Sequence, residues 1–147
     1  MAEKLIIKSL PIPPIANHRL VPVNGRLIKS KDSREFDKAI QLWILRQKSA
    51  IFPIRHKIKE WIDVGYCLKV DLKYTWEKSK IITKNGLPQR LDLDGRIKEI
   101  LDALADIYDF DDKYVISLTA SKTYWNKSWS EVNASIEPHS WELSDDS

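Results

Sequence analysis

The feature that most constrains the fold of this chain is a run of strict alternation at residues 65–76. The apolar side chains on one side of this extended segment are Tyr66, Leu68, Val70, Leu72, Tyr74 and Trp76. The side chains on the other side are Cys67, Lys69, Asp71 and Lys73. Because successive side chains of a strand point to opposite faces, the pattern predicts a β-strand that covers a hydrophobic core with one side only.

The rest of the chain supplies the elements that pack around this strand. Further strands are expected at residues 4–10, 114–125 and 129–136. Helical spacing of apolar residues predicts helices at residues 31–48, 56–61 and 95–108, with Pro53 ending the first run. The Asn24-Gly25 turn falls in an irregular stretch, and residues 77–91 form a basic loop or a long hairpin tip.

The order of these elements is β-α-β-α-β-β, which favours an α/β (α+β) fold. We expect a single domain over residues 1–137, with a small mixed β-sheet packed against helices. Residues 138–147 form a polar C-terminal tail.

The composition argues against several classes of protein. Cys67 is the only cysteine, so neither an internal disulfide nor a Cys-rich zinc site can form. No apolar run approaches the roughly 20 residues that span a bilayer, and the N-terminus shows no signal peptide. The four glycines form no phosphate-cradling loop, which argues against a nucleotide cofactor. A cytoplasmic protein without a membrane partner is the expectation.

The 147 residues carry a formal net charge of +3, but the charge is divided unevenly. Residues 1–91 contain 19 Lys or Arg against 8 Asp or Glu, and residues 92–147 contain 5 against 13. The basic part suggests a polyanionic partner, because each Lys or Arg that meets a phosphate releases counterions. An acidic cluster on such a protein would repel that partner unless cations neutralise it. A solvated surface with uneven charge is the alternative interpretation.

Carboxylates stand on both sides of the helix expected at residues 95–108. Asp92 and Asp94 are two residues apart, so in an extended segment they project to the same side. If the strand after Asp112 lies beside the segment that holds Asp92, three carboxylates can meet. Oxygen ligands of this kind suit Mg²⁺ or Mn²⁺. Lys98 follows Asp94 by one helical turn, where it can contact a phosphate or hold Asp94 in position.

Each of these residues also has a purely structural interpretation. Asp94 is a suitable helix N-cap, and Asp94, Lys98 and Asp102 have the i,i+4 spacing of surface ion pairs. The acidic turn at residues 109–112 can simply be solvated. Three aromatic residues near the next turn can stack on unpaired bases, but cross-strand packing is the favoured interpretation. These residues are Tyr124, Trp125 and Trp129.

The segment from Arg90 to Leu104, RLDLDGRIKEILDAL, resembles the signature of the RusA family of Holliday junction resolvases. That signature reads D-x-D-N-x-x-K-x-x-x-D-A-L, followed by a short spacer and a D-D pair, which here is Asp111-Asp112. The segment PPIAN at residues 13–17 is similar to the family's P-P-x-x-N segment, and Gly25-Arg26 is similar to its following basic turn. The resemblance covers most of residues 5–125.

The resemblance implies a small homodimeric α/β endonuclease, typically of phages and prophages, that cuts four-way DNA junctions symmetrically with Mg²⁺. Matched position by position, the family's catalytic carboxylates fall on Asp92, Asp94 and Asp112, with Asp111 as a substitute for the third. The family's essential lysine falls on Lys98. The family usually has Asn where this chain has Gly95, so an amide that can orient a carboxylate is missing.

We therefore expect a Mg²⁺-dependent endonuclease, with Mn²⁺ as a substitute, that resolves four-way junctions by paired symmetric cuts. The expected products carry 5′-phosphate and 3′-hydroxyl ends, and the expected location is the cytoplasm of a bacterial or phage-infected cell. The residues expected to bind the junction are Asn17, Arg19, Arg26, Lys29, Lys78, Lys80, Lys84 and Arg90. The alternatives are a less selective branched-DNA or flap nuclease, a catalytically decayed junction-binding protein, and a protein-interaction module.

Overall fold

The alternating segment forms β4 (Cys67–Glu77) in the computed structural model, which describes residues 3–14, 20–87 and 93–141. At alternate positions from Leu68 to Tyr74 its apolar side chains are completely buried. On the opposite side, Asp71 and Lys73 are exposed. The predicted one-sided strand is therefore confirmed, although Cys67, at its start, is buried as well.

β4 lies inside a four-stranded mixed sheet with the strand order β1-β6-β4-β5. The other three strands are β1 (Leu5–Leu10), β5 (Val115–Trp125) and β6 (Glu131–His139). β6 runs antiparallel to both β1 and β4, whereas β5 runs parallel to β4. A parallel pair needs a crossover between its strands, and here the chain between β4 and β5 contains two helices.

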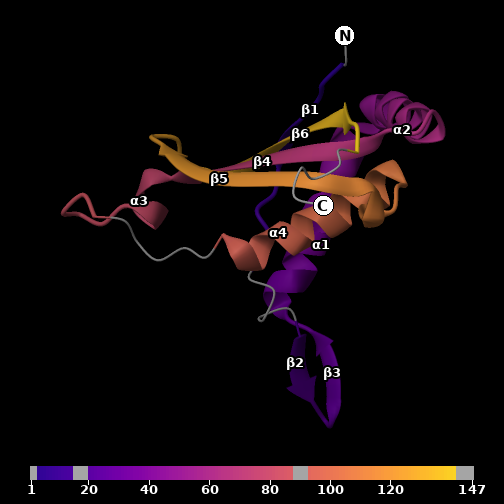
Figure 1. Cartoon of the computed structure of the whole chain (residues 1–147). Helices are drawn as coiled ribbons and strands as arrows, with labels where there is room; N and C mark the ends of the chain where they lie inside the picture. Colours follow the sequence, from indigo (N-terminus) through magenta and orange to yellow (C-terminus); the bar gives the residue numbers. More distant parts are fainter. Residues whose placement is uncertain (1–2, 15–19, 88–92, 142–147) are drawn as a thin grey trace, which may run out of the picture.

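The helices pack against one face of this sheet. They are α1 (Lys31–Arg46), α2 (Lys48–Asp63), α3 (Lys78–Ile81) and α4 (Asp94–Tyr108), with the short 3-10 helix η2 (Asp112–Tyr114) leading into β5. Figure 1 shows α1 and α4 lying below the sheet. The other face is polar, and there the hydroxyl of Thr119 donates a hydrogen bond to the carboxylate of Asp71 on the neighbouring strand. The predicted α+β fold, with a small mixed sheet packed against helices, is confirmed.

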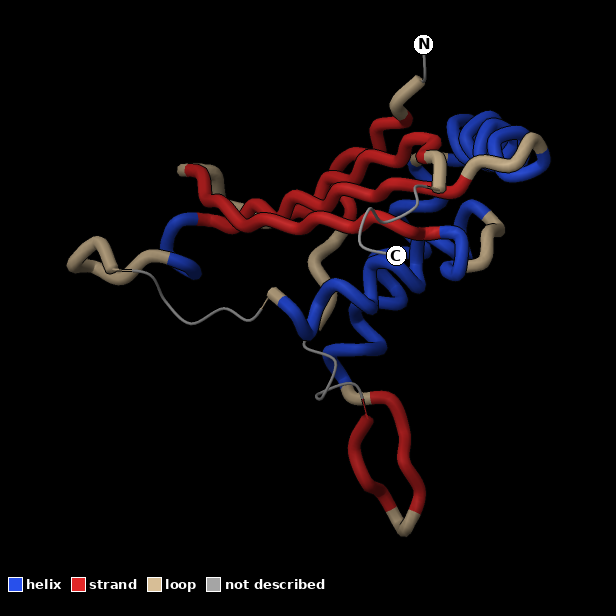
Figure 2. The backbone as a smooth tube through the Cα atoms, viewed as in Figure 1, coloured by secondary structure: helices blue, strands red, loops and turns tan. Residues whose placement is uncertain are grey.

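A hairpin stands where the sequence indicated an irregular stretch. Its strands, β2 (Leu20–Val23) and β3 (Arg26–Lys29), form a second sheet of their own. Figure 2 shows this hairpin as a separate red loop at the end of the helix that follows it. Asn24 and Gly25 both have positive φ, as a tight two-residue hairpin turn requires. The prediction of a turn was correct, and the strands on either side of it were missed.

Two further predictions need correction. α2 runs without a break from Lys48 to Asp63, whereas only residues 56–61 were expected to be helical. Pro53 and Ser49, whose carbonyl would have accepted the missing N–H, are both exposed, so water can replace the lost hydrogen bond. In the basic loop, residues 78–81 form α3, and the buried side chain of Ile81 fixes this helix to the core.

Candidate functional site

The N-terminal end of α4 is fixed to the sheet through Arg96. The Tyr74 hydroxyl on β4 donates a hydrogen bond to the Arg96 carbonyl at 3.0 Å. The Arg96 Nε donates to the Pro13 carbonyl at 3.1 Å, and the guanidinium lies 5.8 Å from the centroid of the Trp76 ring. Three separate parts of the chain therefore meet at the first turn of α4.

Tyr74 remains a neutral hydrogen-bond donor in this arrangement. Burial raises the pKa of its hydroxyl strongly, and the nearby positive charge of Arg96 opposes this only in part. The hydrogen bond to the Arg96 carbonyl is thus retained over the whole physiological pH range. The position of the helix start does not depend on a group that titrates there.

One of the predicted carboxylates, Asp94, belongs to this end of the helix. Asp92 lies outside the described residues. Asp94 is the first residue of α4, but its side chain is outside what the structure describes. The N-cap position is Leu93, which makes no side-chain capping hydrogen bond. The structural interpretation of Asp94 as the N-cap residue is therefore wrong by one position.

The third predicted carboxylate lies at the other end of α4. This helix has 15 residues, and at about 1.5 Å per residue it is roughly 22 Å long. Asp112 follows its C-terminus and is exposed, and the neighbouring Asp111 accepts a hydrogen bond from the Lys113 N–H at 3.0 Å. Figure 1 shows α4 running from the α3 side of the molecule to the opposite side, where η2 leads into β5.

The strand register also places Asp112 far from the start of α4. β5 begins at Val115, which pairs with Leu68, whereas the start of α4 is bound to Tyr74, six residues further along β4. Six residues of a strand span about 20 Å. One chain therefore does not bring Asp112 to the helix end that Asp94 begins. The meeting of all three carboxylates stays a prediction, because Asp92 and the side chain of Asp94 lie outside what the structure describes.

Lys98 lies on the solvent side of α4, one turn after Asp94. Its side chain is 66% exposed, and its Nζ lies 3.8 Å from a carboxylate oxygen of Asp102. The structural interpretation of this lysine as part of an i,i+4 ion pair is thus confirmed. An exposed pair of this kind contributes only a few tenths of a kcal/mol, so the ammonium group can leave Asp102 at little cost.

Acidic side chains also line a groove of about 500 Å³ between α1 and α4. Its lining residues are Lys29, Phe36, Asp37, Ile40, Gln41, Glu99, Asp102, Ala103 and Asp106. Within the part of the chain that the structure describes, no three acidic, histidine or cysteine side chains are arranged to hold a metal ion. The groove is therefore a negatively charged surface beside α4 and not a formed metal site.

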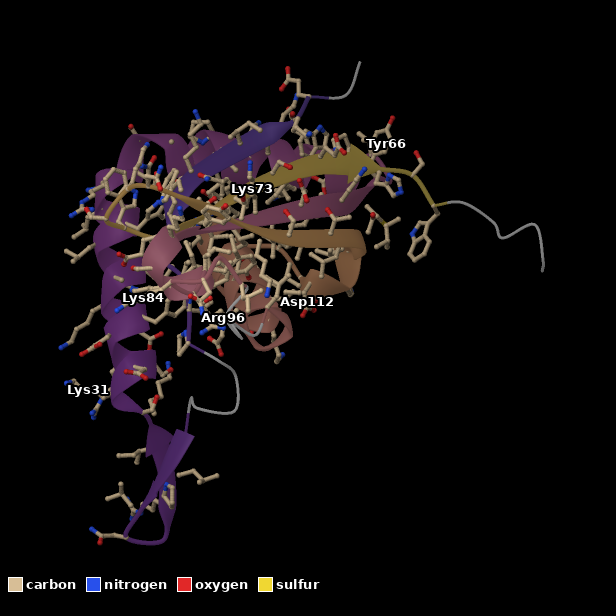
Figure 3. All side chains as sticks on the ribbon, turned by 90° about the vertical axis from the view of Figure 1, so that its left-hand side faces the viewer. Lys31, Tyr66, Lys73, Lys84, Arg96 and Asp112 are labelled. Atoms are coloured by element: carbon tan, nitrogen blue, oxygen red, sulfur yellow. The ribbon has the colours of Figure 1, made fainter. Side chains whose placement is uncertain are left out.

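Five of the eight residues predicted to bind DNA can be placed. Arg26 and Lys29 are on β3, Lys78 and Lys80 are on α3, and Lys84 is in the turn after α3. The other three, Asn17, Arg19 and Arg90, lie outside the described residues. Figure 3 views the molecule from the α3 side and shows Lys84 and Arg96 below the sheet, on its helix-covered side.

Two of these lysines make contacts with acidic neighbours. Lys29 Nζ lies 2.6 Å from an Asp37 carboxylate oxygen, and Lys80 Nζ lies 3.2 Å from one of Glu77. These pairs are partly exposed, so a phosphate can replace the carboxylate without a large loss of free energy. The five predicted DNA-binding residues that can be placed thus lie on two projections, the β2–β3 hairpin and the α3 segment, which we define as residues 78–84.

Two of the three aromatic residues near the β5–β6 connection, Trp125 and Trp129, pack on each other, whereas Tyr124 is 47% exposed. β5 and β6 are not neighbours in the sheet, so this contact lies within the connection and is not the cross-strand packing favoured from the sequence. The rings of Trp125 and Trp129 meet edge to face with centroids 5.6 Å apart. Lys127 Nζ lies 4.4 Å and 5.1 Å from the two ring centroids, and Trp125 Nε1 donates to the Trp129 carbonyl. These contacts give the two tryptophans a structural role in the turn without a contact to DNA bases.

Sequence reasoning missed the residues that hold the start of α4. Arg96 lies inside the acidic motif, and Tyr74 and Trp76 belong to the apolar side of β4, so none of them stood out. Their only signal is that two aromatic residues end the buried side of the strand. The exposed apolar residues of the β2–β3 hairpin were missed too, although an Asn-Gly pair between apolar residues is a strong hairpin signal.

Comparisons with known proteins identify a relationship over most of the chain. The model of a family described as Endodeoxyribonuclease RusA matches residues 11–137. None of the curated proteins compared with the chain matches it. Among the described residues, no helix has the length and apolar character needed to cross a membrane.

Proposed function

Because the chain belongs to the RusA family of endodeoxyribonucleases, whose general activity is the cleavage of Holliday junctions, we propose that it is a Mg²⁺-dependent homodimer. It would resolve four-way junctions by paired symmetric cuts that leave 5′-phosphate and 3′-hydroxyl ends. The observation that supports the proposal is that Asp94, the second aspartate of the D-x-D motif, begins α4 at its fixed end, between two basic projections. We place this activity in the cytoplasm of a bacterial or phage-infected cell.

Carboxylates at the start of α4 fit a hard divalent cation. Asp92 and Asp94 would hold Mg²⁺, and Mn²⁺ would substitute because both ions prefer oxygen ligands. The chemistry that such an ion supplies is activation of the attacking water and stabilisation of charge on the phosphate. Arg96 supports the site by holding the first turn of the helix against Tyr74 and Pro13.

The third ligand, Asp112, requires a second subunit. Two antiparallel copies of α4, related by a two-fold axis near the middle of the helix, would place Asp112 of the partner subunit beside Asp94. Along α4, the half-buried side chains of Ile97, Leu101 and Ala105 recur every fourth residue, as a helix–helix contact needs. A two-fold dimer has two such sites, which explains why two strands of a junction would be cut together.

Lys98 would contact the phosphate that is cut. Its side chain is mostly exposed, lies one turn from Asp94 and forms a weak ion pair with Asp102. A positive charge at this place stabilises the charge that develops in the transition state. The basic residues of the hairpin and of the α3 segment would hold the junction arms through phosphate contacts.

Cleavage of a labelled four-way junction by the wild type and by Asp94→Asn, each with and without Mg²⁺, tests the proposal. The wild type should cut only with Mg²⁺ or Mn²⁺. The variant should bind the junction equally well and fail to cut, and ligation of the products should reseal them without end repair. A wild type that binds but leaves the junction intact with both metals contradicts the catalytic proposal.

One observation favours a second candidate function. Gly95 replaces the asparagine that the family usually has beside the second aspartate, so this chain could be a junction-binding protein that has lost catalysis. In that case Asp94→Asn would have no cleavage to remove. Gly95→Asn separates the two cases, because it should raise the cleavage rate of an enzyme with a weakened site. Cleavage of fork, flap and linear DNA at the same concentrations as the four-way junction tests the alternative of a less selective nuclease.

A further inference from the structure

The β2–β3 hairpin projects from the body of the protein. Figure 1 shows it beyond the N-terminal end of α1, away from the four-stranded sheet. Every residue from 22 to 29 is exposed. The hairpin is joined to the helices by the ion pair between Lys29 and Asp37. A two-stranded ribbon of this length is marginally stable in water, so a surface that covers it would stabilise it.

Apolar side chains occupy the end of this projection. Leu27 is 69% exposed, and Val23 and Ile28 are exposed to 43% and 39%. Pro22 pairs with Leu27 across the ribbon, so these two side chains lie on the same face. Apolar groups at such a position raise the free energy while they remain in water, and the free energy falls when another apolar surface covers them.

The charge around these apolar residues selects the kind of partner. Residues 11–31 contain four Lys or Arg and no Asp or Glu. Two such hairpins from two subunits would repel each other, whereas a polyanion would attract both. Phosphates can pair with the positive charges of Arg26 and Lys29, but they make no favourable contact with the apolar side chain of Leu27. DNA bases that have lost a stacking neighbour offer an apolar surface next to phosphates, and they occur at a branch point.

We propose that the hairpin inserts Leu27, with Pro22 beside it, against the unstacked bases at the branch point of the DNA. This inference rests on the proposed junction activity and names the element that recognises the branch. Proteins commonly insert Leu or Pro side chains between base steps, and the cost is the unstacking of those bases. At a branch point this cost is already reduced. Arg26 and Lys29 bind the flanking phosphates.

The dimensions of the hairpin agree with this role. A four-residue strand spans about 13 Å, which exceeds the depth of a DNA groove, roughly 8 Å. The tip can therefore reach the bases while Lys29, at the other end of the strand, remains at the level of the phosphates. Covering a leucine that is mostly exposed corresponds to about a tenfold change in affinity.

A four-way junction with 2-aminopurine at the branch point tests the proposal, because the fluorescence of this base rises when it is unstacked. The protein is bound without divalent metal, so that binding is measured apart from cleavage. The variants are Leu27→Ala, Leu27→Met, which keeps apolar bulk, and Leu45→Ala as matched control. Leu45 lies on α1 and is 67% exposed, close to the value for Leu27.

We expect the wild type, Leu27→Met and Leu45→Ala to raise the fluorescence to the same level. Leu27→Ala should lose most of this rise, and its preference for the junction over linear duplex should fall about tenfold. A wild type that binds the junction without a fluorescence rise overturns the proposal, and so does a Leu27→Ala variant that keeps both rise and preference.

Three further outcomes separate this inference from others. If Leu27→Ala changes the mass measured by light scattering from dimer to monomer, the hairpin contacts the second subunit and the proposal is wrong. If the wild type cuts junctions but the fluorescence does not depend on Leu27, only this inference fails. If the wild type neither binds nor cuts junctions, the proposed function fails and this inference fails with it.

Discussion

A mixture of two inactive subunits tests how the catalytic carboxylates come together. Asp94 begins a 15-residue helix that is roughly 22 Å long and Asp112 follows its other end, whereas ligands of one Mg²⁺ ion lie about 2.1 Å from that ion. In the proposed dimer each site takes Asp94 from one subunit and Asp112 from the other. Asp94→Asn and Asp112→Asn should each abolish junction cleavage as homodimers.

The heterodimer of these two variants should regain activity. One of its sites carries both substitutions, and the other carries neither. Differently tagged subunits can be co-expressed and the heterodimer purified through both tags, with wild-type heterodimer as the control. On a labelled junction it should show about half of the wild-type number of active sites, and its products should be single nicks instead of paired cuts. A heterodimer of Lys98→Ala and Asp94→Asn serves as the negative control. Both residues belong to the same end of α4, so each of its two sites carries one substitution and no site is intact.

The geometric reasoning is refuted if the purified heterodimer is as inactive as its parents. That result would mean that each site takes Asp94 and Asp112 from the same chain. It is equally refuted if Asp112→Asn cuts at the wild-type rate. Asp112 is exposed and follows the end of α4, so its substitution should leave the folding free energy nearly unchanged. Circular dichroism on each variant checks this.

Three further predictions follow from the contacts around α4. Lys98→Ala should lower the cleavage rate by about 10²-fold and leave the affinity for the junction unchanged. The thermal midpoint of this variant should not change, because the exposed ion pair of Lys98 contributes little stability. A cleavage rate within threefold of the wild type contradicts the catalytic role of Lys98. Arg96→Ala removes the hydrogen bond to the Pro13 carbonyl and should lower the free energy of unfolding in urea by about 2 kcal/mol, with Arg96→Lys nearly as damaging because lysine lacks the planar group. Burial raises the pKa of Tyr108 to about 12 and that of Tyr74 further, so the stability that these neutral hydroxyls contribute is complete below pH 10 and is lost as the pH rises towards 12. In Tyr108→Phe the free energy of unfolding should therefore fall less between pH 10 and 12. If it falls as steeply with pH as in the wild type, the raised pKa of Tyr108 is not the cause.

Elements with strong periodicity could be predicted from the sequence. The alternation of β4 and the helical spacing of α4 depend on which residues must face the core, and both were confirmed. Pro53 misled the prediction of α2, because a proline disfavours a helix interior but does not always end it, and here the carbonyl that it leaves unbonded is on the exposed side. The hairpin was missed because Pro22 and an exposed apolar set on both faces do not alternate as a half-buried strand does.

The site could be predicted in its residue types but not in its assembly. Asp94, the second aspartate of the D-x-D motif, and Lys98 belong to the first turns of α4, where a sequence pattern can place them. The distance to Asp112 depends on β5 being parallel to β4, which sends the chain back along the length of α4 before the strand begins. Nothing in the local sequence distinguishes a parallel from an antiparallel neighbour, and the role of Arg96 depends on Pro13, which is distant in sequence.

The most direct test of the central claim uses a supercoiled plasmid that extrudes a cruciform, which is a four-way junction with two equivalent strands to cut. With Mg²⁺, the wild type should convert the plasmid to the linear form, with both breaks at the cruciform base, and the ends should be ligatable. Asp94→Asn should bind the cruciform and leave the plasmid supercoiled. A wild type that leaves it supercoiled in both Mg²⁺ and Mn²⁺ contradicts the enzyme proposed here, and one that gives only nicked circles contradicts the paired cuts of a two-site dimer.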